Sequence, residues 1–196
     1  MIYNYTIMTT IKPKPEGYNS VTPSLTFKDS NKAIEFYKEL FGATEKYRLE
    51  YNNKMVHAEI KIGDTNIMLA DEMPEMHSKS AQTIGDTPIQ LYIYADNVDS
   101  TFAKAIKMGA KEDFPVKTQF YGDRTGAFTD PFGYKWTVAT KVKDVSMEQI
   151  KANLKDFVEH MDKPATNNDY QDKYLKYKQK YLELKESIAK KLANKS

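Results

Sequence analysis

The sequence repeats itself at an offset of 67 residues, and this duplication constrains the fold more than any other feature of the chain. Gly42-Ala43-Thr44-Glu45 recurs as Gly109-Ala110-Lys111-Glu112, and Asp29 recurs as Asp96. The order of the predicted elements recurs with them. A single copy of such a unit leaves one apolar sheet face without cover, so we expect the two copies to fold together.

The first unit has the pattern β-α-β-β-β. Residues 21–27 alternate apolar and polar side chains as a half-buried strand does, and Pro23 favours an edge position. Asp29 and Ser30 are N-cap candidates for an amphipathic helix of about three turns that ends at Gly42. Three strands follow, and the second unit repeats the order. Strands are expected at 48–51, 56–62, 66–70, 89–95, 127–128 and 136–140, and the second helix at 99–108.

Several stretches in this frame resemble the vicinal-oxygen-chelate superfamily, the group of glyoxalase I and the bleomycin-resistance proteins, and specifically its PhnB-like branch. They are Thr22-Pro23-Ser24-Leu25, Ala33-Ile34-Glu35-Phe36-Tyr37, Phe41-Gly42-Ala43, His57-Ala58-Glu59, Ile62-Gly63-Asp64, Tyr121-Gly122-Asp123-Arg124 and Asp130-Pro131-Phe132-Gly133. The resemblance covers residues 18–145, with modules at 18–72 and 88–142, after a lead-in at 1–17 that we expect to be flexible. It implies an α+β fold in which two βαβββ modules form a cupped mixed sheet, followed by C-terminal helices. It also implies a homodimer, since members of this superfamily commonly pair.

The composition excludes several classes of function. The 196 residues contain no cysteine, which rules out disulfides, thiolate metal sites and thiol nucleophiles. The net charge is +2, and nearly all positive charge is lysine, which is poorly suited to bidentate recognition of phosphates and bases, so no nucleic-acid ligand is expected. No signal peptide and no apolar run long enough to span a bilayer is present, which predicts an intracellular protein with no membrane partner.

In metal-using members of the superfamily, His, Gln or Glu side chains from the first and last strands of each unit hold a divalent ion in the cup. The resemblance places Thr22, Gln90, Thr137 and an apolar position near Leu69 at the four ligand positions. One amide oxygen, that of Gln90, does not hold a metal. We therefore expect a degenerate site with no metal and no cofactor.

His57 and Glu59 are the candidate catalytic pair. Strand alternation puts them on one face, opposite Val56, Ala58 and Ile60, where the cup is expected. A histidine beside a carboxylate in a sheltered cup can transfer protons. The alternative is a hydrogen-bonded pair that only orders the cup.

Tyr121 and Arg124 belong to a loop that could present an arginine and a tyrosine to an anionic or carbonyl group at the mouth of the cup. Alternatively, Asp123 and Arg124 pair and brace the loop. The segment Asp130-Pro131-Phe132-Gly133 is interpreted as turn chemistry, with no catalytic role.

Five further residues are candidates for a ligand pocket. Gln90, Tyr92 and Thr137 supply polar contacts, and Trp136 with Tyr92 and Tyr94 could supply flat apolar surface. Trp136 is the only tryptophan, and a place in the core is the alternative for it.

The C-terminal part forms a separate predicted unit. Ser146 and Gln149 make a capping box for an amphipathic helix at 146–161, and 162–169 is a predicted linker. At 170–192, Tyr170, Tyr174, Tyr177, Tyr181, Leu184 and Ile188 have the spacing of a coiled-coil seam. The stretch 173–185 resembles a C-terminal signature of proteins from mimivirus-like giant viruses. This implies a host-cytoplasmic or virion-associated protein whose tail docks a protein partner. The alternative is a solvated amphipathic helix that only supports dimers.

Three functions fit these features. The first is a small-molecule-binding PhnB-like protein with a degenerate metal site. The second is a metal-dependent lyase or isomerase of the glyoxalase type that uses Gln90, His57 and Glu59. The third is a resistance protein that sequesters its ligand. The sequence does not choose a substrate.

Overall fold

The structure, a computed structural model, describes residues 11–161 and divides into two compact units. One unit holds the duplicated modules, and the other holds residues 120–122 together with residues 143–161 of the described chain. The predicted linker at 162–169 and the predicted seam helix at 170–192 lie outside the described residues and stay predictions. Within the described residues, no helix is long and apolar enough to cross a membrane.

The first module has the predicted β-α-β-β-β order. Its strands form a four-stranded sheet in the order β1-β4-β3-β2, in which β1 and β4 are parallel and the other neighbours are antiparallel. Strand β1, which begins directly after Pro23, is therefore an edge strand, as predicted. The elements are β1 (Ser24–Phe27), α1 (Ser30–Phe41), β2 (Thr44–Tyr51), β3 (Lys54–Ile62) and β4 (Thr65–Asp71).

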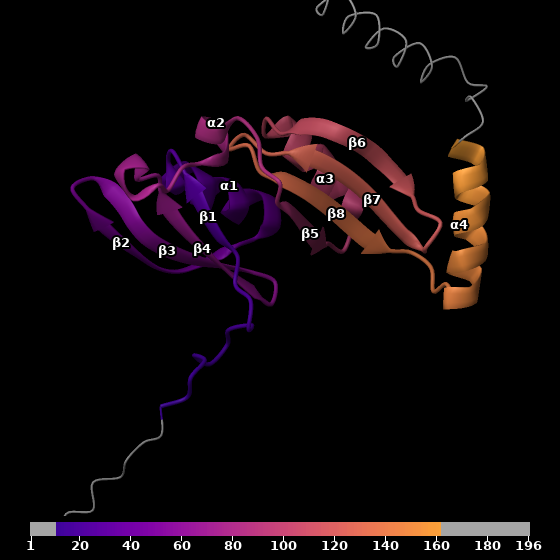
Figure 1. Ribbon diagram of the computed structural model, residues 1–196, viewed down its shortest axis with the longest axis horizontal. Coiled ribbons are helices and arrows are strands. Elements are labelled where there is room, and N and C mark those ends of the chain that lie inside the picture. Colours follow the sequence, from indigo (N-terminus) through magenta and orange to yellow (C-terminus); the bar gives the residue numbers. More distant parts are fainter. Residues whose placement is uncertain (1–10, 162–196) are drawn as a thin grey trace, which may run out of the picture. The chain divides into compact units, whose positions relative to one another are not determined.

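The second module repeats this topology with the order β5-β8-β7-β6, so the expected duplication is confirmed (Figure 1). Its strand β6 was not predicted, because most of its side chains are exposed and Pro115 interrupts it. A short 3-10 helix and α2 connect the modules. The elements are η1 (Pro74–Met76), α2 (Ala81–Ile84), β5 (Gln90–Tyr94), α3 (Val98–Lys107), β6 (Lys111–Thr118), β7 (Asp123–Thr129) and β8 (Lys135–Lys141).

Helix α1 begins and ends where its capping residues predict. The Asp29 carboxylate accepts a hydrogen bond from the Lys32 backbone N–H at 3.1 Å, and Gly42 adopts the left-handed conformation with φ of 67°. Between these caps the apolar positions of the helix are buried against the sheet, namely Ala33, Ile34, Phe36, Tyr37 and Leu40. One face of the first sheet is thereby covered by α1.

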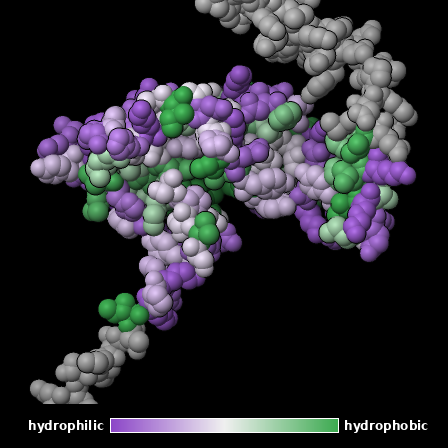
Figure 2. Space-filling model, viewed as in Figure 1, coloured by the Kyte–Doolittle hydropathy of each residue, from purple (hydrophilic) through white to green (hydrophobic). Residues whose placement is uncertain are grey.

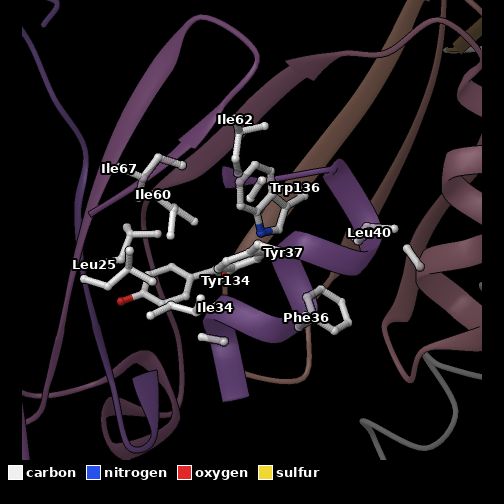
Figure 3. Close-up of a cluster of buried hydrophobic side chains, with 14 of the residues drawn as sticks. Leu25, Ile34, Phe36, Tyr37, Leu40, Ile60, Ile62, Ile67, Tyr134 and Trp136 are labelled. Carbon is white, nitrogen blue, oxygen red and sulfur yellow. The ribbon is translucent and has the colours of Figure 1, made fainter. Parts of the chain in front are cut away.

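A buried aromatic cluster joins the two modules (Figure 3). The Tyr37 hydroxyl of α1 donates to Asp130 of the second module at 2.6 Å, and the Trp136 indole donates to the same carboxylate at 3.0 Å. The Tyr134 hydroxyl bonds to both the backbone N–H and the carbonyl of Thr26. The segment that begins at Asp130 does form a turn, as predicted, but its buried carboxylate also holds the modules together.

The last described helix, α4 (Met147–Met161), belongs to the second unit. The predicted capping box is present. The Ser146 N–H donates to the Gln149 side chain at 3.1 Å, and the Gln149 N–H donates back to the Ser146 hydroxyl at 3.3 Å.

Candidate functional site

The sheet face opposite α1 carries His57 and Glu59, as strand alternation predicts. On β3, Ala58 and Ile60 are completely buried in the core, so the residues between them point the other way. The expectation for Val56 is wrong, because Val56 is 43% exposed. The pairing of β2 with β3 shifts register there, so that Val56 is an extra residue on β3 and the alternation breaks.

Glu59 is a buried carboxylate surrounded by donors, with its side chain 3% exposed. The Tyr47 hydroxyl donates to it at 2.7 Å and the Lys46 ammonium at 3.1 Å. The Tyr18 hydroxyl makes a further short hydrogen bond, and His57 Nε2 lies 3.2 Å away. Burial alone would raise the pKa of Glu59, but these four partners together lower its pKa to about 2. The carboxylate is therefore ionised at neutral pH.

His57 is the group of this cluster that can meet a ligand. Its side chain is 31% exposed, and its Nε2 is oriented by the Glu59 carboxylate. Within residues 11–161, its Nδ1 has no hydrogen-bond partner in the structure. An imidazole that is oriented by a carboxylate and keeps one open nitrogen can accept or donate a proton.

On the second module, Gln90, Tyr92 and Thr137 share the face opposite α3, since Tyr92 and Thr137 are paired across β5 and β8. The Gln90 amide donates to the Thr137 hydroxyl at 2.7 Å. The Tyr92 and Tyr94 hydroxyls donate to the buried Asp123 carboxylate at 3.3 and 2.8 Å. This face therefore combines an amide, a hydroxyl and two half-exposed phenol rings.

Two expected ligand residues are engaged by other parts of the structure. Arg124 makes a bidentate pair with Asp99 of α3, at 2.8 and 2.7 Å, so it lies on the opposite face of the sheet from Asp123. The alternative of an Asp123–Arg124 pair is not what the structure has either. Trp136 is 3% exposed and belongs to the core. Tyr121 lies in the second unit, where its ring contacts Phe120, and its role stays a prediction.

A groove of about 680 Å³ runs along β5 and the end of α1. Its walls include Phe41, Trp136 and Tyr92, and its rim includes Asn97 and Thr101. Neither His57 nor Glu59 lines it. The residues expected to form one ligand site are therefore divided between this groove and the exposed sheet faces.

Three hydrogen-bonding partners of Glu59 were not predicted from the sequence. Tyr47 lies directly opposite Glu59 on β2, so strand pairing could have identified it. Lys46 precedes it at a register shift, where alternation gives no guidance. Tyr18 is 41 residues from Glu59, and no local pattern points to it.

The side chains present do not fit the metal that other members of the superfamily hold. Thr22 precedes β1, and Leu69 is buried in the core on the face that packs against α1. Thr137 accepts the hydrogen bond of Gln90. Glu59 already accepts hydrogen bonds from two phenols and the Lys46 ammonium, and the charge of that ammonium repels a cation. Among residues 11–161, no three His, Asp or Glu side chains gather as a metal-binding group.

Comparison with known proteins identifies the family. The profile of the Glyoxalase/Bleomycin resistance protein/Dioxygenase superfamily matches residues 18–138, so the chain belongs to this superfamily. An uncharacterized protein of Mycobacterium tuberculosis is 33% identical over 139 residues, which is 69% of this chain and 82% of that protein. An uncharacterized protein of Mycobacterium bovis is also 33% identical over 139 residues, with 91% of it covered.

Solved structures show the same fold. A Pseudomonas aeruginosa protein matches with a TM-score of 0.52 and 20% identity, over 63% of this chain and 98% of that chain. A PhnB protein from Bacillus cereus matches with a TM-score of 0.51 and 17% identity, over 62% and 99%. The fosfomycin resistance protein FosX of Listeria monocytogenes, solved with Mn(II) and sulfate, matches with a TM-score of 0.50 and 17% identity, over 69% and 97%.

Proposed function

We propose that this chain is a PhnB-like member of the superfamily that binds a small molecule on the exposed sheet face, with His57 as its main polar contact. The observation that supports this most directly is the buried, ionised Glu59 with four hydrogen-bonding partners. Burying an ion is expensive, and an apolar pair is often at least as stable, so such a network suits orientation of a functional group better than stability. The group that it orients is His57.

The exposed face of the second module offers further polar and aromatic groups of the kind that bind small molecules. Gln90 and Thr137 form a hydrogen-bonded pair, and Tyr92 presents a ring that is 48% exposed. Flat aromatic surface with a few convergent polar groups is typical of small-molecule sites. Arg124 and Trp136 are left out of the proposed contacts, because Asp99 and the core engage them.

A metal-dependent lyase of the glyoxalase type is the weaker proposal. Its chemistry needs a Lewis acid in the cup, and the donors around Glu59 oppose a cation there. We expect no turnover of the glutathione–methylglyoxal adduct, with or without added Ni²⁺, Zn²⁺ or Mn²⁺. Turnover that depends on the added metal would contradict the proposed function and support the lyase instead. Tight binding without turnover would fit the sequestering alternative.

Fragment binding to the full chain tests the proposal. Saturation-transfer NMR with a library of small carbonyl and carboxylate compounds is compared between the natural chain and three variants. His57→Ala should weaken binding at least fivefold, and Glu39→Ala on the exposed face of α1 should not change it. Thr101→Arg places a long side chain in the groove beside β5 and should also have no effect. Loss of binding in Thr101→Arg but not in His57→Ala would show that the ligand binds in the groove, and would contradict the proposal.

A further inference from the structure

Helix α4 carries an exposed apolar stripe, which we define as Met147, Leu154 and Val158. These side chains are 61%, 44% and 47% exposed. Successive residues of an α-helix are about 100° apart, so the three lie within about 40° of arc. Figure 2 shows hydrophobic residues gathered along this helix.

The neighbouring turn covers only the edge of this apolar face. The Phe157 ring lies 5.2 Å from the Phe120 ring, and the Asn153 amide donates to the Phe120 carbonyl at 3.0 Å. Both side chains project from α4 at roughly 60–100° from Leu154, on one side of the stripe. A helix of 15 residues is marginal in water without packing, so α4 needs a second contact along the stripe itself.

We propose that residues 170–188 of the same chain form a helix that folds back on α4 in antiparallel orientation and covers the stripe. The apolar positions of the two segments are mirror images about the middle of the predicted linker, 162–169. Leu154 and Tyr177 lie equally far from that midpoint. Ile150 and Tyr181 are also equidistant from it, as are Met147 and Leu184, and Val158 meets Tyr174 within one residue.

The length of the linker and the charges of the two segments favour contact between residues 170–188 and α4. Eight residues are within the usual length of about 2–8 for a connection between antiparallel helices. A linker this short gives the tethered segment an effective concentration on the order of millimolar, which favours its own α4 over that of a second copy. Residues 162–196 contain nine Lys against five Asp and Glu, whereas α4 contains three acidic residues and two lysines. Tyrosine at the seam suits a contact that stays partly wet.

Disulfide trapping tests the register in the full chain, which has no cysteine of its own. Leu154→Cys is combined with Tyr177→Cys, which the register places opposite. The matched control combines Leu154→Cys with Gln179→Cys, which projects about 200° away from Tyr177 around the same helix. Under mild oxidation, the first pair should close within one chain at least tenfold faster than the control.

Hydrogen exchange provides a second measurement that needs no crosslink. Replacing both Tyr177 and Tyr181 by Lys should speed amide exchange in α4 at least tenfold and leave β3 and β8 unchanged. Equal trapping rates in both cysteine pairs, disulfides formed between two chains, or unchanged exchange in α4 would each overturn the proposal. Disulfides between chains would identify a second copy as the occupant.

Discussion

Asp130 is the residue whose removal should weaken the fold most sharply. Its carboxylate is 3% exposed and accepts four hydrogen bonds. Its Oδ2 accepts from Tyr37 at 2.6 Å and Trp136 at 3.0 Å, and its Oδ1 accepts from the backbone N–H groups of Phe132 and Tyr134, both at 2.9 Å. Burial and the adjacent carboxylate raise the pKa of Tyr37 well above its ordinary value, so its hydroxyl stays protonated and donates.

Asp130→Ala leaves these donors without an acceptor in a largely buried site. An unsatisfied buried donor costs about 1–3 kcal/mol. Release of the buried charge offsets part of the sum, because burial raises the pKa of Asp130 even against its four donors. We expect a net loss of about 3–5 kcal/mol of unfolding free energy, which resembles the breaking of a buried ion pair. For a chain of this size that lowers Tm by about 10 °C.

Asp130→Asn should cost less, about 1–3 kcal/mol, because the amide oxygen still accepts on one side while its NH₂ group faces donors on the other. Urea unfolding followed by the fluorescence of Trp136, the only tryptophan, measures both changes. Asp113→Ala is the matched control, since its carboxylate is exposed and, within residues 11–161, bonds only the Thr129 hydroxyl. A loss below about 1 kcal/mol for Asp130→Ala would refute the role of this carboxylate as the junction.

The hydrogen bonds to Glu59 lower its pKa from 4.5 to about 2 despite its burial, so the contribution of the carboxylate to stability is full above about pH 4.5 and is lost as the pH falls through 2. Glu59→Gln should therefore lose about 2 kcal/mol of unfolding free energy at pH 7 and only a small part of that at pH 2, by urea titration. Gly122→Ala places a Cβ 2.3 Å from the Lys143 carbonyl at a φ of +102°, and should speed hydrogen exchange at the Lys143 amide at least tenfold. The side chains of Leu49 and Phe114 are 57% and 63% exposed and leave apolar surface that a second copy of the chain could cover. A chain truncated after Asp162 should therefore give twice the monomer mass by light scattering, and a monomer would contradict this.

The sequence predicts the core of this fold well, because the core follows from local periodicity. The helix between Asp29 and Gly42 and the edge position of the strand after Pro23 both follow from residues within a few positions of each other. Strand β6 does not, since an exposed edge strand has no apolar period to detect. The break in side-chain alternation at Val56 was not predicted either, because a bulge depends on the pairing of two strands and not on the pattern within one.

The site is predicted less completely, for a related reason. Alternation along a single strand places His57 and Glu59 together correctly. What holds them depends on residues that arrive from other elements, such as Tyr18 from before the first strand. The motif around Arg124 gave no information on its partner, because Asp99 lies 25 residues away on α3.

On each of the two exposed sheet faces, a buried carboxylate accepts hydrogen bonds from two tyrosine hydroxyls. Glu59 accepts phenol hydroxyls from Tyr18 and Tyr47, and Asp123 accepts them from Tyr92 and Tyr94. A phenol is a weak acid whose hydroxyl donates to a carboxylate without adding charge, so both carboxylates are hydrogen-bonded inside the protein by neutral donors. The chain keeps the fold of its superfamily, and the polar groups on its exposed sheet faces include phenol hydroxyls, the Gln90 amide and the His57 imidazole.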